Sequence, residues 1–515
     1  MESNNINYKE EVLKAGLIMA GVSIIMTMLV YVINIELMVS WWFGLMSLTL
    51  SMGFAIYLGI SYRNLCGGFL SYKEALKFSF LAFLVSYATG IVFNILLYTV
   101  IDPGLPEVMK DLTIEATIGM MESFGTPQEV IDASMVEIEN SVISYSTKAF
   151  SNPYILNLLN DHDMSIDVVT GGELAVAKYV DFSAERINFH GNNKSIEELS
   201  EAVDYGINHI TIDSFNEIEN LKRICESKSI DQDIMIRVSP SIDPHTHLLT
   251  TTGILDSKFG FSIETGDAEK AIEKIMKIKS LNLQGLHFHL GSPIFELEPY
   301  SEAIDYVYKF ASEMKKKYGF EMPEFSPGGG FAIGYLSEKK PLSIREYAKT
   351  ICDSVKESCD KYGFDIPKIT LEPGRALIGR SGVSIYRVGS IKNIPTVRNY
   401  VSVDGGMGDN IRPALYGSEY SVFSVSKINQ KNNLIKSTVS GKFCESGDYL
   451  ARDVMLPNPE INDLLVLPAS GAYNLAMASN YNMQTRPAVV VIKDNKPILI
   501  RRRETYEDLL STSTI

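Results

Sequence analysis

The amino-acid sequence predicts a multi-domain protein, in which an N-terminal α-helical membrane module precedes a (β/α)8 barrel and a C-terminal all-β domain. Three observations support this fold class. Long apolar runs occupy residues 1–101, short β-rich runs alternate with helical stretches over 141–380, and strands without intervening helices fill 381–515. Residues 102–140 are polar and acidic, and we expect them to form a helical linker or arm. A chain of 515 residues also exceeds the size of one hydrophobic core.

Three stretches near the N-terminus are long and apolar enough to cross a lipid bilayer. Ala15–Ile33 contains no charged residue over 19 positions, and Leu37–Ile60 and Phe78–Ile101 contain none over 24 positions each. A transmembrane helix needs about 20 apolar residues, so all three qualify. Aromatic residues of the kind that favour membrane interfaces lie near their ends, namely Trp41, Trp42, Tyr57 and Tyr98. One such run would fit a buried soluble helix, but three in succession favour a module that contacts the bilayer through residues 15–101.

Basic residues predict the orientation of this module. Lys9 and Lys14 precede the first span, and Arg63, Lys73 and Lys77 lie between the second and the third. Loops rich in Lys and Arg stay in the cytoplasm, so both groups fit a cytoplasmic N-terminus in the bacterial inner membrane. Three spans then place the rest of the chain outside the cytoplasm.

Composition excludes several classes of function. The formal net charge is -15 and the pI is about 5.1, so no basic domain is available to neutralise the phosphates of a nucleic acid. The five cysteines are scattered, with no C-x-x-C pair, and no H-E-x-x-H spacing occurs. We therefore expect no metal site and no disulfide framework, and a reducing compartment is the simpler interpretation.

Eight short β-rich runs alternate with helical stretches after residue 141. Eight strands joined by seven crossovers favour a closed parallel barrel over an open sheet. The runs are VISYST, SIDVVT, RINFH, HITID, IMIRV, GLHFHLG, PEFSPGGG and KITLEPG. Residues with useful chemistry stand at their C-terminal ends, where barrel enzymes place the active site: Lys148, Thr170, His190, Asp213, Arg237, His289, Gly328 and Glu372.

Lys148 follows the first of these runs, between Thr147 and Ala149. A solvated charge is the simplest explanation of a single lysine at a strand end. A lysine at the rim of a barrel also suits Schiff-base chemistry, because burial lowers the pKa of an amine and makes it a better nucleophile. The corresponding partner is pyridoxal 5′-phosphate, whose ring serves as an electron sink.

Three further motifs would complete such a cofactor site. The glycines at 328–330 would let backbone amides approach a phosphate, although most glycine runs only mark turns. Glu372 could keep a pyridine nitrogen protonated and Arg375 could bind an anion, although a surface ion pair explains both residues equally. His287 and His289 share one strand face, and one of them could stack on a cofactor ring or simply belong to the core.

Eight motifs between Ser141 and the C-terminus resemble one enzyme family. They are YSTKAF, DVVTGGELAVA, FHGNNKS, GLHFHLGS, LEPGRA, SVDGGMGDNIRPALYG, CESGD and YNMQTRPAVV. In this order and spacing they are similar to bacterial diaminopimelate decarboxylases, which belong to the alanine-racemase-like, fold type III pyridoxal-phosphate enzymes. The resemblance covers 375 residues and implies pyridoxal 5′-phosphate as the cofactor.

The resemblance also implies a role for individual residues. Lys148 would hold the cofactor and Cys444 would donate a proton. Cofactor contacts are implied for His289, which would stack on the ring, and for Ser292, Gly329, Gly330, Glu372, Gly374 and Tyr473. Substrate contacts are implied for Arg375, Arg412, Tyr416 and Glu445. In the family, Cys444 and Glu445 reach into the neighbouring subunit's site, so a homodimer with shared active sites is expected.

The same resemblance implies decarboxylation of meso-2,6-diaminopimelate to L-lysine and CO2, a step of lysine biosynthesis. The substrate amine would displace Lys148, CO2 would leave, and the alpha carbon would be protonated before lysine returns. A racemase of the same fold pairs the ring nitrogen with arginine, whereas this chain has Glu372. An ornithine-type decarboxylase has aspartate after the cysteine, whereas this chain has Glu445.

The chain departs from the family before Lys148. The family has about forty more residues there, which supply a strand of the β-domain and the opening helix of the barrel, and 102–140 does not resemble them. Residues 1–135 instead resemble a small multi-span bacterial membrane domain of unknown function, for which GGFLSYKEALKFS is typical. Two modules joined near residue 136 are therefore expected. The sequence therefore predicts a membrane-tethered enzyme, whose function would place its catalytic domain in the cytoplasm. The alternative is a non-catalytic fusion of a membrane module with a truncated barrel.

Overall fold

The structure, a computed structural model, describes residues 7–33, 35, 37, 41–102, 105, 141–243, 252–253, 255–336, 340–428, 430 and 432–514. The chain divides into two compact units, residues 1–135 and 136–515. Nearly all of the predicted arm over 102–140 lies outside the described residues, as do the side chains of Trp41 and Trp42.

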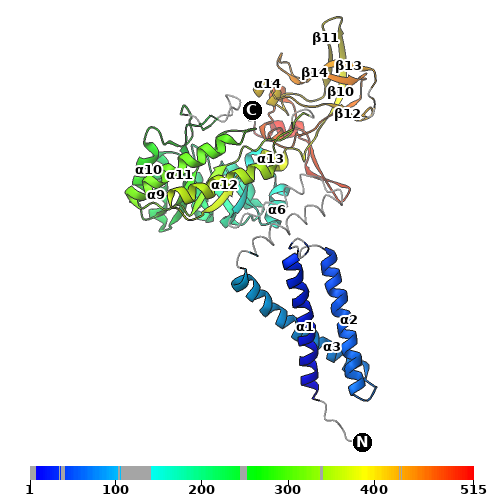
Figure 1. Ribbon diagram of the computed structural model, residues 1–515. Coiled ribbons are helices and arrows are strands. Elements are labelled where there is room, and N and C mark those ends of the chain that lie inside the picture. Colours follow the sequence, from blue (N-terminus) through cyan, green and yellow to red (C-terminus); the bar gives the residue numbers. More distant parts are fainter. Residues whose placement is uncertain are drawn as a thin grey trace. The chain divides into compact units, whose positions relative to one another are not determined.

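The described part of the first unit contains three long helices, α1 (Tyr8–Ile33), α2 (Trp41–Leu65) and α3 (Tyr72–Leu96), and α3 continues as a π-helical turn over Leu97–Ile101 (Figure 1). Helix α1 packs closely on α3 because Gly16 has no side chain. A Cβ at Gly16 would lie 2.5 Å from the Cβ of Val85. A capping box formed by Ser71 and Glu74 begins α3.

The helical prediction for the N-terminus is confirmed, whereas the prediction of three spans is not. Among the described residues, two helices are long and apolar enough to cross a membrane, Tyr8–Ile33 and Tyr72–Ile101. The predicted span over Leu37–Ile60 coincides with α2, which does not meet that test within the described residues. The length and composition of these two helices suggest membrane association. The core helices of soluble proteins and secretion signals meet the same test.

All eight predicted strands are present in the second unit, and they close into a parallel barrel. The strand β1 pairs with β2 on one side and with β9 on the other, and β4 pairs with β5 to complete the ring. The barrel strands are β1 (Ser141–Ser146), β2 (Ser165–Val168), β3 (Ile187–Phe189), β4 (His209–Ile212), β5 (Gln232–Ser239), β7 (Leu281–His287), β8 (Glu324–Gly328) and β9 (Lys368–Leu371). A short strand, β6 (Phe261–Ser262), pairs with the end of β5.

Helices join the strands and shield the outside of the barrel (Figure 1). Several begin with a Ser or Thr cap, and α8, α9, α11 and α12 end at a residue in the left-handed conformation. The helices are α6 (Pro153–Asp161), α7 (Gly171–Tyr179), α8 (Ile196–Tyr205), α9 (Phe215–Lys228), α10 (Asp267–Ile275), α11 (Glu298–Tyr318), α12 (Ile344–Tyr362) and α13 (Arg375–Ile378).

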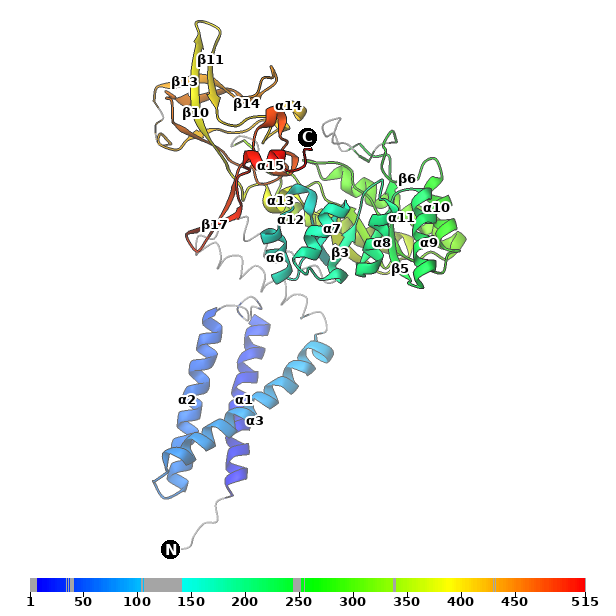
Figure 2. The same ribbon diagram turned by 180° about the vertical axis from the view of Figure 1, so that it is seen from behind.

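The C-terminal part is mostly sheet, as predicted. Six strands form one sheet in the order β12-β15-β10-β11-β13-β14, and β16 and β17 form a separate hairpin. Strand β17 and helix α15 are seen best from behind (Figure 2). The elements are β10 (Ser384–Ile394), β11 (Arg398–Val403), α14 (Arg412–Tyr416), β12 (Phe423–Ser424), β13 (Leu434–Ser440), β14 (Tyr449–Pro457), β15 (Leu464–Leu467), β16 (Val489–Lys493), β17 (Lys496–Arg501) and α15 (Tyr506–Leu510).

Segments of the β-domain return to the barrel and join its wall. The backbone N–H of Tyr473 donates to the carbonyl of Ala149 at 2.8 Å, directly after Lys148. The hydroxyl of Ser421 donates to the carbonyl of Tyr335 at 3.3 Å. These contacts place β-domain side chains beside the C-terminal ends of the barrel strands.

Candidate active site

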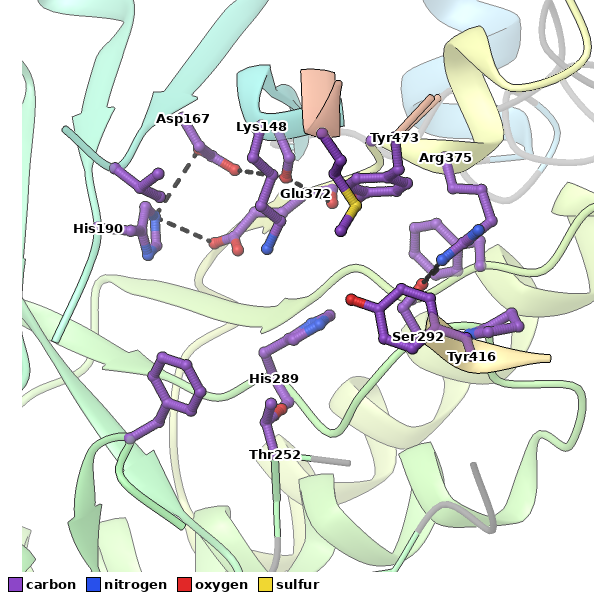
Figure 3. Close-up of a pocket in the computed structure, with 18 of the residues that line it drawn as sticks. Lys148, Asp167, His190, Thr252, His289, Ser292, Glu372, Arg375, Tyr416 and Tyr473 are labelled. Carbon is purple, nitrogen blue, oxygen red and sulfur yellow. Dashed lines mark hydrogen bonds and ion pairs between the residues drawn. The ribbon is translucent and has the colours of Figure 1, made fainter. Parts of the chain in front are cut away.

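A cavity of about 900 Å³ opens at the C-terminal ends of the barrel strands, and residues of the β-domain complete its wall (Figure 3). Most of the site residues expected from the sequence line this one cavity. They are Lys148, His289, Ser292, Gly330, Glu372, Gly374, Arg375, Arg412, Tyr416 and Tyr473. Gly329 lies directly beside this wall, whereas Cys444 and Glu445 lie elsewhere.

Lys148 stands on a 3-10 turn, Thr147–Ala149, which directly follows β1. Its neighbours are fixed, since the Thr147 hydroxyl donates to the carbonyl of Asp167 at 2.7 Å and the Ser146 hydroxyl donates to the carbonyl of Glu372 at 3.1 Å. Lys148 itself is exposed, because its side chain extends into the open cavity (Figure 3). Burial of this lysine was expected from the sequence, and that expectation is wrong for the single chain.

Glu372 follows β9 and is buried below the cavity. The Ser326 hydroxyl donates to its Oε1 at 2.6 Å, and His287 Nε2 lies 3.0 Å from its Oε2. Burial raises the pKa of Glu372 to about 7, although the Ser326 hydrogen bond and the charge of Lys148 oppose that change. A carboxyl group poised in this way can hold or release a proton near neutral pH.

Two histidines and an aspartate surround Glu372. The sequence placed His190 at the rim of the barrel and left His287 as an alternative to His289 for ring stacking, whereas Asp167 was not predicted. His190 Nε2 lies 3.6 Å from Glu372 Oε1 and 3.8 Å from Asp167 Oδ1. Burial is the main cause that lowers the pKa of His190 and His287 well below the usual value and raises the pKa of Asp167. The ligand atoms of His190, His287 and Glu372 lie within 4.8 Å of one another, although the sequence predicts no metal site.

Sequence signals for these three residues existed. Asp167 interrupts an apolar strand, His190 ends the next one, and His287 precedes the expected His289 on the same face. Each was compatible with an ordinary core or strand-end residue. Only closure of the barrel brings them together.

The glycine run after β8 forms a tight cradle beside Glu372. Gly328 and Gly330 have positive φ angles of 74° and 107°, which side chains rarely adopt. A Cβ at Gly329 would lie 2.0 Å from the carbonyl oxygen of Glu372. Only glycine fits there. The N–H of Gly329 donates to His289 Nδ1 at 3.3 Å, and Gly330 lines the cavity, where bare backbone can approach an anionic group such as a phosphate.

Two arginines form another part of the cavity wall. Arg375 and Arg412 are buried, and both donate to the Tyr335 hydroxyl, at 2.5 Å and 2.9 Å respectively. Arg375 also donates to the Ser292 hydroxyl through Nε and a terminal nitrogen, both at 3.2 Å. Tyr416, at the end of α14, contributes to the same wall. The sequence interpretation missed Tyr335, which lies on the loop after β8.

Cys444 and Glu445 are exposed and do not line the cavity of their own chain. They belong to a turn that Asp448 organises by accepting hydrogen bonds from the N–H groups of Met407 and Phe443, at 2.7 Å and 2.8 Å. The backbone N–H of Cys444 donates to Asn482 Oδ1 at 3.0 Å. The structure of one chain therefore does not bring these two predicted residues to the others.

The residues present fit pyridoxal 5′-phosphate. An accessible amine at Lys148, a buried carboxyl at Glu372 and a side-chain-free cradle at the glycine run face one cavity. These are the groups that an aldehyde, a ring nitrogen and a phosphate require.

The raised pKa of Glu372 predicts a pH-dependent cost to folding. Its carboxyl group keeps a proton in the folded state that the unfolded chain releases between pH 4.5 and about 7, so stability falls as pH rises through that window. Between about pH 5 and about pH 8, we expect the unfolding free energy of the cofactor-free Glu372→Gln variant to rise by about 2.5 kcal/mol relative to that of the wild type. Denaturant unfolding at the two pH values measures the change. A stability difference that does not vary with pH would contradict the assignment.

Comparison with known proteins agrees with this geometry. Residues 129–379 match a family model described as the pyridoxal-binding domain of pyridoxal-dependent decarboxylases, and residues 14–160 match DUF4199, a protein family of unknown function. The two matches overlap around β1 and Lys148. The chain is thus similar to one family in its N-terminal helices and to another in its barrel.

Relatives cover most of the second unit. Diaminopimelate decarboxylase of Bacillus subtilis is 41% identical over 404 residues, which span 76% of this chain and 92% of the relative. Diaminopimelate decarboxylase of Staphylococcus aureus is 37% identical over 407 residues, which span 76% of this chain and 94% of the relative. The structure of diaminopimelate decarboxylase from Helicobacter pylori with L-lysine matches with a TM-score of 0.68 and 31% identity, and the match covers 75% of this chain and 93% of that one. The structure from M. jannaschii with L-lysine matches with a TM-score of 0.70 and 31% identity, and the match covers 78% of this chain and 94% of that one. The chain therefore belongs to the diaminopimelate decarboxylase family of pyridoxal-dependent enzymes, with pyridoxal 5′-phosphate as its cofactor.

Proposed function

We propose that this chain decarboxylates meso-2,6-diaminopimelate to L-lysine and CO2 in the cavity at the barrel rim. One observation supports this most strongly: Lys148, Glu372, His289 and the glycine run meet at a single cavity that also contains two buried guanidinium groups. A cofactor site and a site for an acidic substrate are thus adjacent.

The residues of this chain hold the cofactor in the proposed assignment. Lys148 provides the amine for the covalent link, and Glu372 faces the ring nitrogen. His289 and Tyr473 contact the ring, while Ser292 and the backbone of Gly329, Gly330 and Gly374 bind the phosphate. Bound in this way, pyridoxal phosphate supplies an electron sink for the charge left when CO2 departs.

Arg375, Arg412 and Tyr416 bind the carboxylate that is kept. Both guanidinium groups are shielded from water, which strengthens their attraction for a carboxylate. A bidentate contact also fixes the orientation of the substrate. The carboxylate that is lost then lies on the side of Lys148.

The proton donor and the second recognition group come from a partner subunit. Cys444 and Glu445 are exposed and remote from their own cavity, which fits a homodimer in which each chain completes the site of the other. Cys444 protonates the alpha carbon, a step worth about 10²–10⁴-fold in rate. Glu445 binds the distal ammonium group of the substrate.

Closure of the barrel favours this function over a non-catalytic fusion. All eight strands pair in one ring that begins at Ser141, and a buried apolar cluster packs the strands against the surrounding helices. The cavity lies at the opposite end of β1 from residue 141.

The remaining assignments concern the division of the chain. Residues 1–101 tether the protein to the bacterial inner membrane, 102–140 form an arm, 141–380 form the catalytic barrel and 381–515 the β-domain. Only 17% of the most apolar stretch of Tyr8–Ile33 is buried within the structure, and only 11% of that of Tyr72–Ile101. Such exposure suits contact with lipid better than the core of a soluble protein. The barrel faces the cytoplasm.

An assay of the full chain, purified in detergent and supplied with cofactor, tests the function. We expect L-lysine and CO2 from meso-2,6-diaminopimelate and no amine product from L-ornithine. The opposite preference, or no product from either, would reject the proposal. In the same cells, the chain should stay in the membrane pellet after an alkaline carbonate wash, and its release would reject the tether.

A further inference from the structure

The Tyr335 hydroxyl connects two buried cations. Its oxygen accepts hydrogen bonds from Arg375 at 2.5 Å and from Arg412 at 2.9 Å, and the residue lines the cavity. The Tyr335 ring packs against Tyr420 of the β-domain, with ring centroids 5.4 Å apart. A barrel loop thus holds together one arginine from the barrel and one from the β-domain.

Neither guanidinium group has a counter-charge in the part of the chain that the structure describes. Arg375 bonds to Ser292 and Tyr335, and Arg412 bonds to Tyr335 and Tyr420, all of which are neutral hydroxyl groups. The exposed fractions of Arg375 and Arg412 are 7% and 5%. Buried charges are normally paired, so two such cations beside a cavity predict an anionic ligand between them.

The Tyr335 hydroxyl has a donor left for that ligand. A phenol oxygen that accepts two N–H bonds still has its own proton to donate. Among the described residues, no protein acceptor is hydrogen-bonded to this proton. We propose that Tyr335 is a specificity-determining residue that donates its hydroxyl proton to the retained carboxylate of the substrate, between Arg375 and Arg412.

The two edges of Arg375 separate this carboxylate from the phosphate of the cofactor. Its Nε edge faces Ser292, which is assigned to the phosphate, whereas the other terminal nitrogen faces Tyr335. Arg412 adds a second donor only on the Tyr335 side. The Tyr335 side is therefore the place for a carboxylate. This inference rests on the proposed function and adds a residue to it.

Paired ligands test the inference. Binding of L-lysine and of 1,5-diaminopentane, which lacks the carboxylate, is measured by calorimetry on cofactor-saturated full chain. Tyr335→Phe should raise the dissociation constant of L-lysine about tenfold or more, the effect of losing a hydrogen bond to a charged group. The dissociation constant of the diamine should stay unchanged. Equal absorbance of the bound cofactor in wild type and variant confirms that the site is folded and loaded.

Tyr420→Phe is the matched control. Tyr420 also accepts from Arg412, at 2.6 Å, but it is buried and does not line the cavity. Its loss should weaken L-lysine binding less than the loss of the Tyr335 hydroxyl. Three outcomes would overturn this inference while leaving the proposed function intact. These are equal weakening of L-lysine binding by the two variants, unchanged L-lysine binding in Tyr335→Phe, and equal weakening of the binding of both ligands by Tyr335→Phe. A loaded wild type that binds neither ligand would overturn the proposed function as well.

Discussion

Lys148→Ala is expected to abolish decarboxylation and the absorbance near 420 nm that is typical of lysine-bound pyridoxal phosphate. Lys148 is the only lysine among the described residues of the cavity wall, and its amine extends into the open cavity. Without it the covalent link cannot form, and we expect the rate to fall by more than about a thousandfold. An absorbance scan and an L-lysine assay on detergent-solubilised protein measure both effects.

An exposed lysine provides the control for this change. Lys178 lies on α7 and forms an ion pair with Glu201 at 2.7 Å, away from the cavity. Lys178→Ala should keep both the absorbance and the activity. An undiminished band in Lys148→Ala would show that another amine binds the cofactor, and a colourless wild type would favour the non-catalytic fusion.

Mixing two inactive variants should restore activity if sites are shared between subunits. Lys148→Ala lacks the amine and Cys444→Ala lacks the proton donor, yet a mixed dimer would contain one site with both groups intact. Random exchange of equal amounts gives about one quarter of the wild-type activity for a two-fold symmetric dimer. Unfolding is not needed for the test, since co-expression of the two chains also forms mixed dimers.

The position of Cys444 makes this expectation specific. It is exposed and does not line the cavity that contains Lys148, so the proposed role of Cys444 requires the site of a second chain. A mixture of Lys148→Ala with Glu372→Gln is the control, because both residues line the same cavity of one chain and no mixed dimer regains a site with both. Failure of the first mixture while each variant still dimerises would reject the shared site.

The barrel strands were predictable from the sequence because their signals are local. The eight β-rich runs became the eight barrel strands. Of the eight residues predicted at their ends, all except Asp213 and Gly328 line the cavity. The exposure of Lys148 was not predictable, since it depends on how far the cavity is open. The second apolar run did not meet the criterion for a membrane span among the described residues.

Other parts of the site depend on contacts between distant segments. Tyr335 and Arg412 are 77 positions apart, and no spacing in either segment relates the loop after β8 to the β-domain. Ser326 and Glu372, 46 positions apart, form a hydrogen bond only because β8 and β9 are neighbours. Asp167, His190 and His287 likewise have ordinary sequence surroundings, and the ring of strands determines their proximity.

The closure of the barrel through β1 and β9 also limits when the site can form during synthesis. The Ser146 hydroxyl bonds to the carbonyl of Glu372 across 226 positions, and β1 has β9 as its second neighbour. Such high contact order makes folding slow, and a ribosome must release the chain beyond residue 372 before β1 can complete its pairing. The lysine is therefore among the first residues of the barrel to be translated, and its surroundings are among the last to be assembled.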